Sequence, residues 1–176
     1  MISTTSPAAA RAKQRPAFTA RELTVTAVMT ALVFLATFVP RIPIPLGYAH
    51  LGDAAIFLLV LLLPSRPALL TACLGSALSD LLGGFALWIL PTLLIKFVMG
   101  YLVLKLTRKD SSIPRTAIAF LLASLWMTAG YTLFGALLYA SLSAGLASAP
   151  GLFLEGLINS GAALLLLPVL RRNIHL

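Results

Sequence analysis

Charged residues are scarce in this chain of 176 residues: only 10% of them are Asp, Glu, Lys or Arg, and only five are acidic. Soluble proteins carry about 25% charged residues. The composition is instead 60% hydrophobic, with a mean hydropathy of +1.00, and a soluble domain cannot hide that much apolar surface. The composition therefore predicts an integral membrane protein of one domain. The net charge of +8 then indicates basic cytoplasmic loops rather than a nucleic-acid partner.

Several motifs that would carry catalysis or energy conversion are also missing. Cys73 is the only cysteine, which excludes a disulfide framework and a cysteine-based metal cluster. The chain has no phosphate-binding P-loop, no H-E-x-x-H zinc motif and no G-x-S-x-G nucleophile motif. It also lacks the internal repeat from which most secondary transporters are built. We therefore expect no enzymatic activity, no cofactor and no metal ion in this chain.

The apolar residues form six segments, at 22–39, 52–63, 67–84, 86–105, 116–140 and 151–170. Most Lys and Arg residues lie in the N-terminal tail, after the second and fourth segments and in the C-terminal tail, whereas the opposite side carries only Arg41. The positive-inside rule then places both termini in the cytoplasm. We predict an all-α protein with six transmembrane helices at 22–172, preceded by a disordered basic tail at 1–21. The small, uncharged residues Ser143–Pro150 should form an external loop between the fifth and sixth helices.

One polar and aromatic stretch, Gly47-Tyr48-Ala49-His50-Leu51-Gly52-Asp53, stands out from the apolar part of the chain. Three prolines precede it, so its entry should be extended rather than helical. The apolar run 52–63 that ends before Pro64 would span only about 18 Å as a helix, whereas the hydrocarbon core is about 30 Å thick. Irregular backbone inside a membrane must be buried in protein or line a wet cavity. We predict that this external loop re-enters the membrane and covers a small-molecule site.

Few polar side chains interrupt the apolar segments, and they lie at or above the predicted membrane middle on the external side. The cytoplasmic halves are nearly all Leu, Val, Ile and Ala. Ionisable groups inside a membrane are costly and are functional candidates by default. Together with the loop, we predict a substrate-binding cup open to the outside, made of Tyr48, His50, Asp53, Asp80, Trp88, Lys96, Tyr131, Glu155 and Asn159.

Structural roles are the alternative for these side chains. Asp53 would cap the short helix, whose exposed N–H groups favour a carboxylate. Asp80 and Lys96 would form an ion pair, and Trp88 and Tyr131 would be interfacial anchors. Both interpretations stay open at the level of the sequence.

A pair of small residues marks one face of the first segment. Ala27 and Ala31 lie four positions apart and therefore share a helix face. Such faces allow another helix to approach closely, and the neighbour could be a helix of this chain or of a partner.

Three stretches resemble, in order and spacing, motifs of the S components of energy-coupling factor (ECF) transporters. They are GYAHLGDAAIFL at 47–58, GSALSDLLGG at 75–84 and TLLIKFVMG at 92–100. The resemblance covers roughly residues 22–170 and is strongest to the branch for riboflavin, hydroxymethylpyrimidine or pyridoxine. One position departs from that branch, whose sixth helix often carries Asn and Gln after Pro-Gly. Here Glu155 stands in the place of the Gln.

The resemblance implies a membrane subunit that captures a vitamin or vitamin precursor from outside. It also implies a transmembrane coupling protein and two ABC-type ATPases as partners, with Ala27 and Ala31 contacting the coupling protein. The loop at about 41–52 would close over the ligand. A prokaryotic cell membrane is the expected location.

The favoured hypothesis is a subunit that binds a pyridoxine- or hydroxymethylpyrimidine-like compound, since an acid at Glu155 suits a ligand with basic or hydrogen-bond-donating groups. The alternative is a stand-alone carrier or channel coupled to protons through Asp80 or Glu155. The first hypothesis predicts binding without accumulation by this chain alone, and the second predicts uptake by the chain alone.

Overall fold

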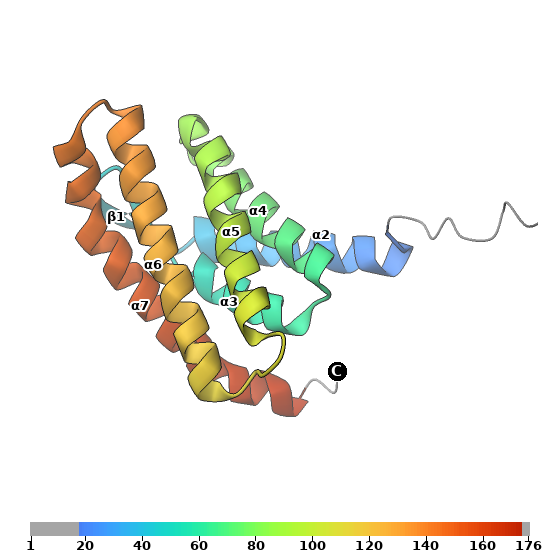
Figure 1. Ribbon diagram of the computed structural model, residues 1–176. Helices are drawn as coiled ribbons and strands as arrows, with labels where there is room; N and C mark the ends of the chain where they lie inside the picture. The colour runs from blue at the N-terminus through green and yellow to red at the C-terminus, as the bar shows by residue number, and fades with distance from the viewer. Residues whose placement is uncertain (1–17, 174–176) are drawn as a thin grey trace, which may run out of the picture.

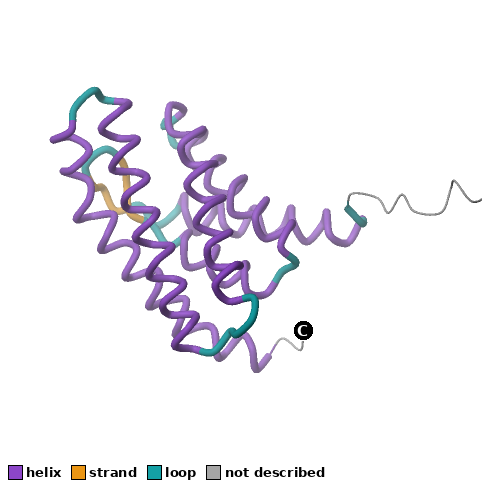
Figure 2. The backbone as a smooth tube through the Cα atoms, in the orientation of Figure 1, coloured by secondary structure: helices purple, strands orange, loops and turns teal. Residues whose placement is uncertain are grey.

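The computed structural model describes residues 18–173. Within them it contains six α-helices and one β-hairpin (Figure 2). The elements are α2 (Ala20–Phe38), β1 (Ile42–Ile44), β2 (Gly47–Ala49), α3 (Gly52–Leu62), α4 (Ser65–Leu82), the 3-10 turn η1 (Ala86–Trp88), α5 (Ile89–Thr107), α6 (Ile113–Leu138) and α7 (Leu142–Asn173). Most of the predicted tail, up to residue 17, lies outside the described residues. The tail was predicted to extend to residue 21, but helix α2 already begins at Ala20, where Thr19 and Glu22 form a capping box.

The short helix α3 lies at the centre of the bundle. It contacts α2, α4, α5 and α7, and most of its side chains are buried. Around it, contacts link the other helices in the order α2, α4, α5, α6 and α7. Figure 1 shows α6 and α7 side by side, with α2 crossing behind the bundle. In the core, the Phe57 ring of α3 stacks on Phe120 of α6 with centroids 4.5 Å apart. A helix too short to span a membrane is thus enclosed by longer ones.

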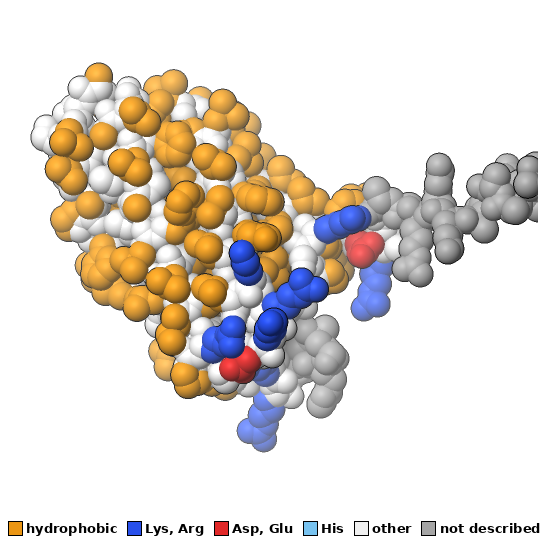
Figure 3. Space-filling model, in the orientation of Figure 1, with side chains coloured by type: hydrophobic (Ala, Val, Ile, Leu, Met, Phe, Trp, Pro, Cys, Tyr) orange, Lys and Arg blue, Asp and Glu red, His pale blue; other side chains and the backbone are white. Residues whose placement is uncertain are grey.

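Four helical segments are long and apolar enough to cross a membrane: Ala20–Phe38, Ala86–Thr107, Ile113–Leu138 and Leu142–Asn173. Their outward faces carry many exposed large apolar side chains, and Figure 3 shows such side chains over most of the visible face. The same view shows Lys and Arg gathered at one end. The chain is therefore a multi-pass helical membrane protein. Six complete crossings and the side that holds the termini stay predictions.

The predicted re-entrant loop is a β-hairpin in the structure. Ile42 pairs with Ala49, Pro43 with Tyr48 and Ile44 with Gly47 in antiparallel register. The connecting residues are Pro45 and Leu46, and Leu46 has a φ of 64°. A proline followed by a residue with positive φ matches a type II turn, which normally takes glycine at the second position. The leucine is therefore held in a strained backbone conformation at the tip of the hairpin.

The prediction of an external loop over Ser143–Pro150 is wrong, because α7 begins at Leu142 and continues through Pro150. Only Tyr139–Ser141 connects α6 to α7. The small residues pack these helices together: a Cβ atom on Gly145 would lie 2.5 Å from the Thr132 carbonyl oxygen of α6. Proline inside a membrane helix is tolerated where neighbouring helices compensate for the lost hydrogen bond.

Candidate functional site

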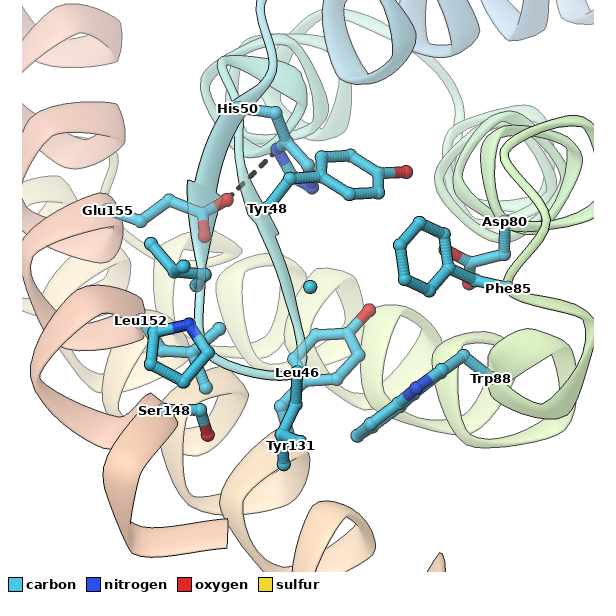
Figure 4. A pocket seen from close by; sticks show the side chains of 13 residues that line it. Leu46, Tyr48, His50, Asp80, Phe85, Trp88, Tyr131, Ser148, Leu152 and Glu155 are labelled. Atoms are coloured by element: carbon cyan, nitrogen blue, oxygen red, sulfur yellow. Dashed lines mark ion pairs between the residues drawn. The ribbon is translucent and has the colours of Figure 1, made fainter. Parts of the chain in front are cut away.

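The β1–β2 hairpin covers a cavity of about 60 Å³ that reaches α4, η1, α6 and α7 (Figure 4). The predicted residues that line it are Tyr48, His50, Asp80, Trp88, Tyr131 and Glu155. The other lining residues are Ile44, Pro45, Leu46, Gly47, Phe85, Ser148 and Leu152. Segments far apart in the sequence therefore converge on one partly open cavity.

Three buried polar atoms at this cavity have no hydrogen-bond partner within residues 18–173: the Tyr48 hydroxyl oxygen, Asp80 Oδ2 and Trp88 Nε1. They come from the hairpin, α4 and η1. Buried polar groups in proteins are ordinarily hydrogen-bonded, and leaving one unpaired costs about 1–3 kcal/mol. These three atoms therefore offer one N–H donor, one carboxylate acceptor and one hydroxyl to whatever occupies the cavity.

His50 and Glu155 meet on the opposite side of the cavity from Asp80 (Figure 4). His50 Nδ1 lies 3.0 Å from Glu155 Oε1 and 3.2 Å from the backbone nitrogen of Gly52. One nitrogen cannot accept from Gly52 and donate to Glu155 together. Glu155 Oε1 is therefore hydrogen-bonded only when His50 carries its proton on Nδ1, and otherwise it is a further unpartnered acceptor.

Aromatic rings supply the walls between these polar groups. The Trp88 and Tyr131 rings have centroids 5.6 Å apart, and the Tyr48 and Phe85 rings are 5.4 Å apart. The Tyr131 hydroxyl forms a hydrogen bond of 3.0 Å with Thr92 Oγ1, which orients the ring. Flat apolar faces with a few polar groups between them suit a small aromatic ligand.

Lys96 does not pair with Asp80. Its ammonium donates instead to Asp53 Oδ1, and both side chains are buried. Neither residue is among those that line the cavity. The pair joins the first turn of α3 to the middle of α5, directly behind Tyr131, whose ring centroid lies 5.4 Å from Lys96 Nζ. Asp53 and Lys96 were predicted to contact the ligand. The structure instead pairs them with each other outside the cavity lining, where they hold α3 against α5.

Asn159 has a similar bracing position on α7. Its Oδ1 accepts from the Ala54 backbone N–H at 2.8 Å, and its Nδ2 donates to the carbonyl oxygens of His50 and Glu155 at 2.7 and 2.9 Å. Both of its amide hydrogens are therefore used. Asn159 ties the end of the hairpin and the start of α3 to α7, and it is not among the residues that line the cavity.

Arg41 holds the other end of the hairpin. Its guanidinium carbon lies 3.9 Å from the Phe38 ring centroid and 4.5 Å from that of Tyr48. The side chain also donates to the Ser79 carbonyl oxygen at 3.5 Å. The sequence identified Arg41 only as the isolated external cation, because its stacking partners become neighbours only in the fold.

Several residues that line the cavity are apolar, so a pattern of polar groups within apolar segments cannot identify them. Leu46, Phe85 and Leu152 carry no such signal. The spacing of two short strands around Pro45 and Leu46 is a hairpin signal that was available. Within residues 18–173, no three His, Cys, Asp or Glu side chains lie close enough to hold a metal ion.

These features define a helical membrane protein with a small polar and aromatic cavity beneath a hairpin. The model of the family "ECF-type riboflavin transporter, S component" matches residues 17–172, and the chain belongs to this family. The family consists of transporter substrate-binding components, which places the chain in vitamin uptake. A protein from Pyrococcus woesei described as "Uncharacterized protein in gap 3'region" is 32% identical over 109 residues, which cover 61% of this chain and 73% of that protein.

Proposed function

We propose that this chain captures a small water-soluble vitamin or vitamin precursor from outside the cell and holds it beneath the β1–β2 hairpin. A pyridoxine- or hydroxymethylpyrimidine-like compound is the favoured ligand. The observation that carries the proposal is the set of unpartnered buried polar atoms around one aromatic-walled cavity, from Tyr48, Asp80 and Trp88.

The charges around the cavity favour a ligand rich in hydrogen-bond donors. Two carboxylates, Asp80 and Glu155, line it. Lys96 does not balance them there, because it is paired with Asp53. A hydroxymethyl group, an amino group or a protonated ring nitrogen would donate to these oxygens, and charge-assisted hydrogen bonds of this kind are the stronger ones.

The size of the cavity favours a single-ring ligand over a tricyclic flavin. Sites for small molecules usually measure about 300–1,000 Å³, whereas this cavity measures about 60 Å³. Ligand entry therefore requires the hairpin to move outward, and a single ring requires the smaller displacement.

The contacts of the hairpin support a lid that moves at its tip. Its two ends are held by Arg41 and by the hydrogen bond from Asn159 to the His50 carbonyl oxygen. The tip packs apolar side chains against glycines of α6 and α7, with Leu46 beside Gly135 and Ile44 beside Gly151. These contacts can separate without leaving a buried polar group unpaired.

Transport would depend on partners. Ala27 and Ala31 are exposed on α2, so this small-residue face is free to contact a transmembrane coupling protein. Two ABC-type ATPases would supply the energy, and the basic end of the bundle would face the cytoplasm.

Binding and uptake measurements test the proposal separately. The purified full chain is screened by thermal shift and native mass spectrometry against pyridoxine, 4-amino-5-hydroxymethyl-2-methylpyrimidine and riboflavin. We expect a single-ring compound to bind, and liposomes with this chain alone to accumulate none of it. Tight binding of riboflavin alone would refute the ligand assignment. Uptake by the chain alone that collapses with the proton gradient would establish the carrier alternative.

A further inference from the structure

A second and much larger cavity, of about 740 Å³, opens at the other end of the bundle. It lies between the C-terminal ends of α3 and α5, the start of α4, the α5–α6 connection and the end of α7. The vitamin-uptake role does not use this cavity, because the hairpin and the small cavity beneath it lie at the opposite ends of α3 and α5.

The lining of this cavity combines two chemistries. One part is apolar, with leucines from α3, α4 and α5 at Leu61, Leu62, Leu69 and Leu104. The other part is basic, with Lys105, Arg108 and Arg171. Among residues 18–173, the lining contains no acidic side chain, and these three cations form no ion pair.

The carboxylate of Asp110 is not among the lining residues and forms no ion pair with these basic residues. It accepts hydrogen bonds from the Ser112 backbone nitrogen at 2.8 Å and from the Ser112 hydroxyl at 3.0 Å. These bonds hold the pKa of the exposed Asp110 carboxyl below its ordinary value. Ser112 thus holds the carboxylate ahead of α6, and no described carboxylate forms an ion pair with the three cations of the cavity.

The position of the cavity matches the surface of a membrane. The helices α5 and α7 end beside it and α6 begins beside it, and all three belong to the segments that are long and apolar enough to cross a membrane. Figure 3 shows the exposed Lys and Arg residues gathered at this end, next to the apolar surface. A basic pocket between helices at this depth meets both the phosphate layer and the first part of the hydrocarbon layer.

We propose that this cavity binds an anionic phospholipid. Arg108, Arg171 and Lys105 would hold the phosphate, since arginine offers paired donors to phosphate oxygens. The first methylenes of the acyl chains would lie along the leucine wall. A lipid is favoured over a soluble phosphate compound because only a lipid uses both the basic and the apolar parts of the lining. The proposal does not depend on which vitamin binds beneath the hairpin.

Native mass spectrometry of the delipidated full chain tests the proposal, with added phosphatidylglycerol, phosphatidylcholine of the same acyl chains, or glycerol 3-phosphate. The test variant is Arg108→Gln/Arg171→Gln. Its matched control, Lys109→Gln/Arg172→Gln, removes the same charge from adjacent positions that do not line the cavity. A third variant, Leu104→Trp, fills the apolar part without changing the charge.

We expect phosphatidylglycerol to bind in preference to phosphatidylcholine, and the test variant to lose about 10- to 30-fold in affinity, since each basic residue at a membrane surface contributes about fivefold. The control should lose much less, and Leu104→Trp should also weaken binding.

Equal loss in the test and control variants would overturn the proposal, because the lipid would then be attracted by the general positive charge of this end and not by the cavity. Equal binding of glycerol 3-phosphate would assign the site to a soluble phosphate compound. If no lipid binds but the test variant alone fails to assemble with the coupling protein, the cavity is a protein-docking surface and the lipid proposal is wrong.

Discussion

Breaking the buried ion pair of Asp53 and Lys96 separates a bracing role from a ligand-binding role. Asp53 is 0% exposed and Lys96 is 1% exposed. The substitution Lys96→Met keeps a long apolar side chain but leaves the Asp53 carboxylate buried without its cation. Removing one partner of a buried pair costs about 3–5 kcal/mol, because an uncompensated charge remains. Asp53 Oδ2 already lacks a hydrogen-bond partner, so little else is available to compensate for the loss.

The second substitution restores most of this stability. In Asp53→Asn/Lys96→Met no charge remains, and the amide keeps the size of the carboxylate at the start of α3. Replacing both members of a buried pair with neutral groups is often close to neutral in stability. The double variant should therefore recover more than half of the loss, and the resulting coupling energy reports the pair itself.

The assay is thermal unfolding in detergent, followed alongside vitamin affinity. A loss of 3–5 kcal/mol corresponds to a fall in Tm of about 6–20 °C for a chain of this size. The lining of the hairpin cavity excludes both residues, so the affinity of the folded single variant should change little. A large loss of affinity with an unchanged Tm would refute this reasoning and return Lys96 to the ligand site. A double variant that is no more stable than Lys96→Met would refute the ion-pair explanation.

Three further predictions follow from the same contacts. Glu155→Gln should weaken binding of a donor-bearing vitamin about 10- to 100-fold, the value of a charge-assisted hydrogen bond, while calorimetry with an analogue that lacks the donor group shows little change. Asn159→Ala should destabilise the chain by about 1–3 kcal/mol for each backbone group left unpaired, including the His50 carbonyl, and a Tm equal to that of the unmodified protein would contradict this bracing role. Ala27→Leu/Ala31→Leu should prevent co-purification with the coupling protein and leave vitamin binding intact, since both residues are exposed on α2; loss of binding instead would indicate a fold defect.

The helix content and the membrane class could be predicted from the sequence because both depend on local properties. Apolar segments bounded by prolines and charged residues mark where helices begin and end, and the short run before Pro64 indicated a helix that cannot span. The loop at Ser143–Pro150 was mispredicted for a physical reason. Gly, Ser and Pro are typical of loops in water, but here the small residues let α7 approach α6 within contact of the Thr132 carbonyl.

The partners of individual side chains were decided by the tertiary structure. Counting residues along a helix gives the depth of a side chain but not the direction in which it points relative to other helices. Asp80 was predicted as the structural partner of Lys96, whereas the packing of α3 against α5 places Asp53 there. Asn159 was predicted to bind ligand, yet its three hydrogen bonds tie the hairpin to α7.

The sequence by itself determined a helical membrane protein. It also predicted that the polar loop and the sparse intramembrane polar residues form one site, because polar groups are costly to bury in lipid. Only the tertiary structure decided that the loop is a hairpin with Leu46 at its tip. It also decided that Tyr48, Asp80, Trp88 and Glu155 face the cavity, whereas Asp53, Lys96 and Asn159 brace it. The reason is that the direction in which a side chain points depends on contacts between segments distant in the chain, which no local sequence pattern specifies.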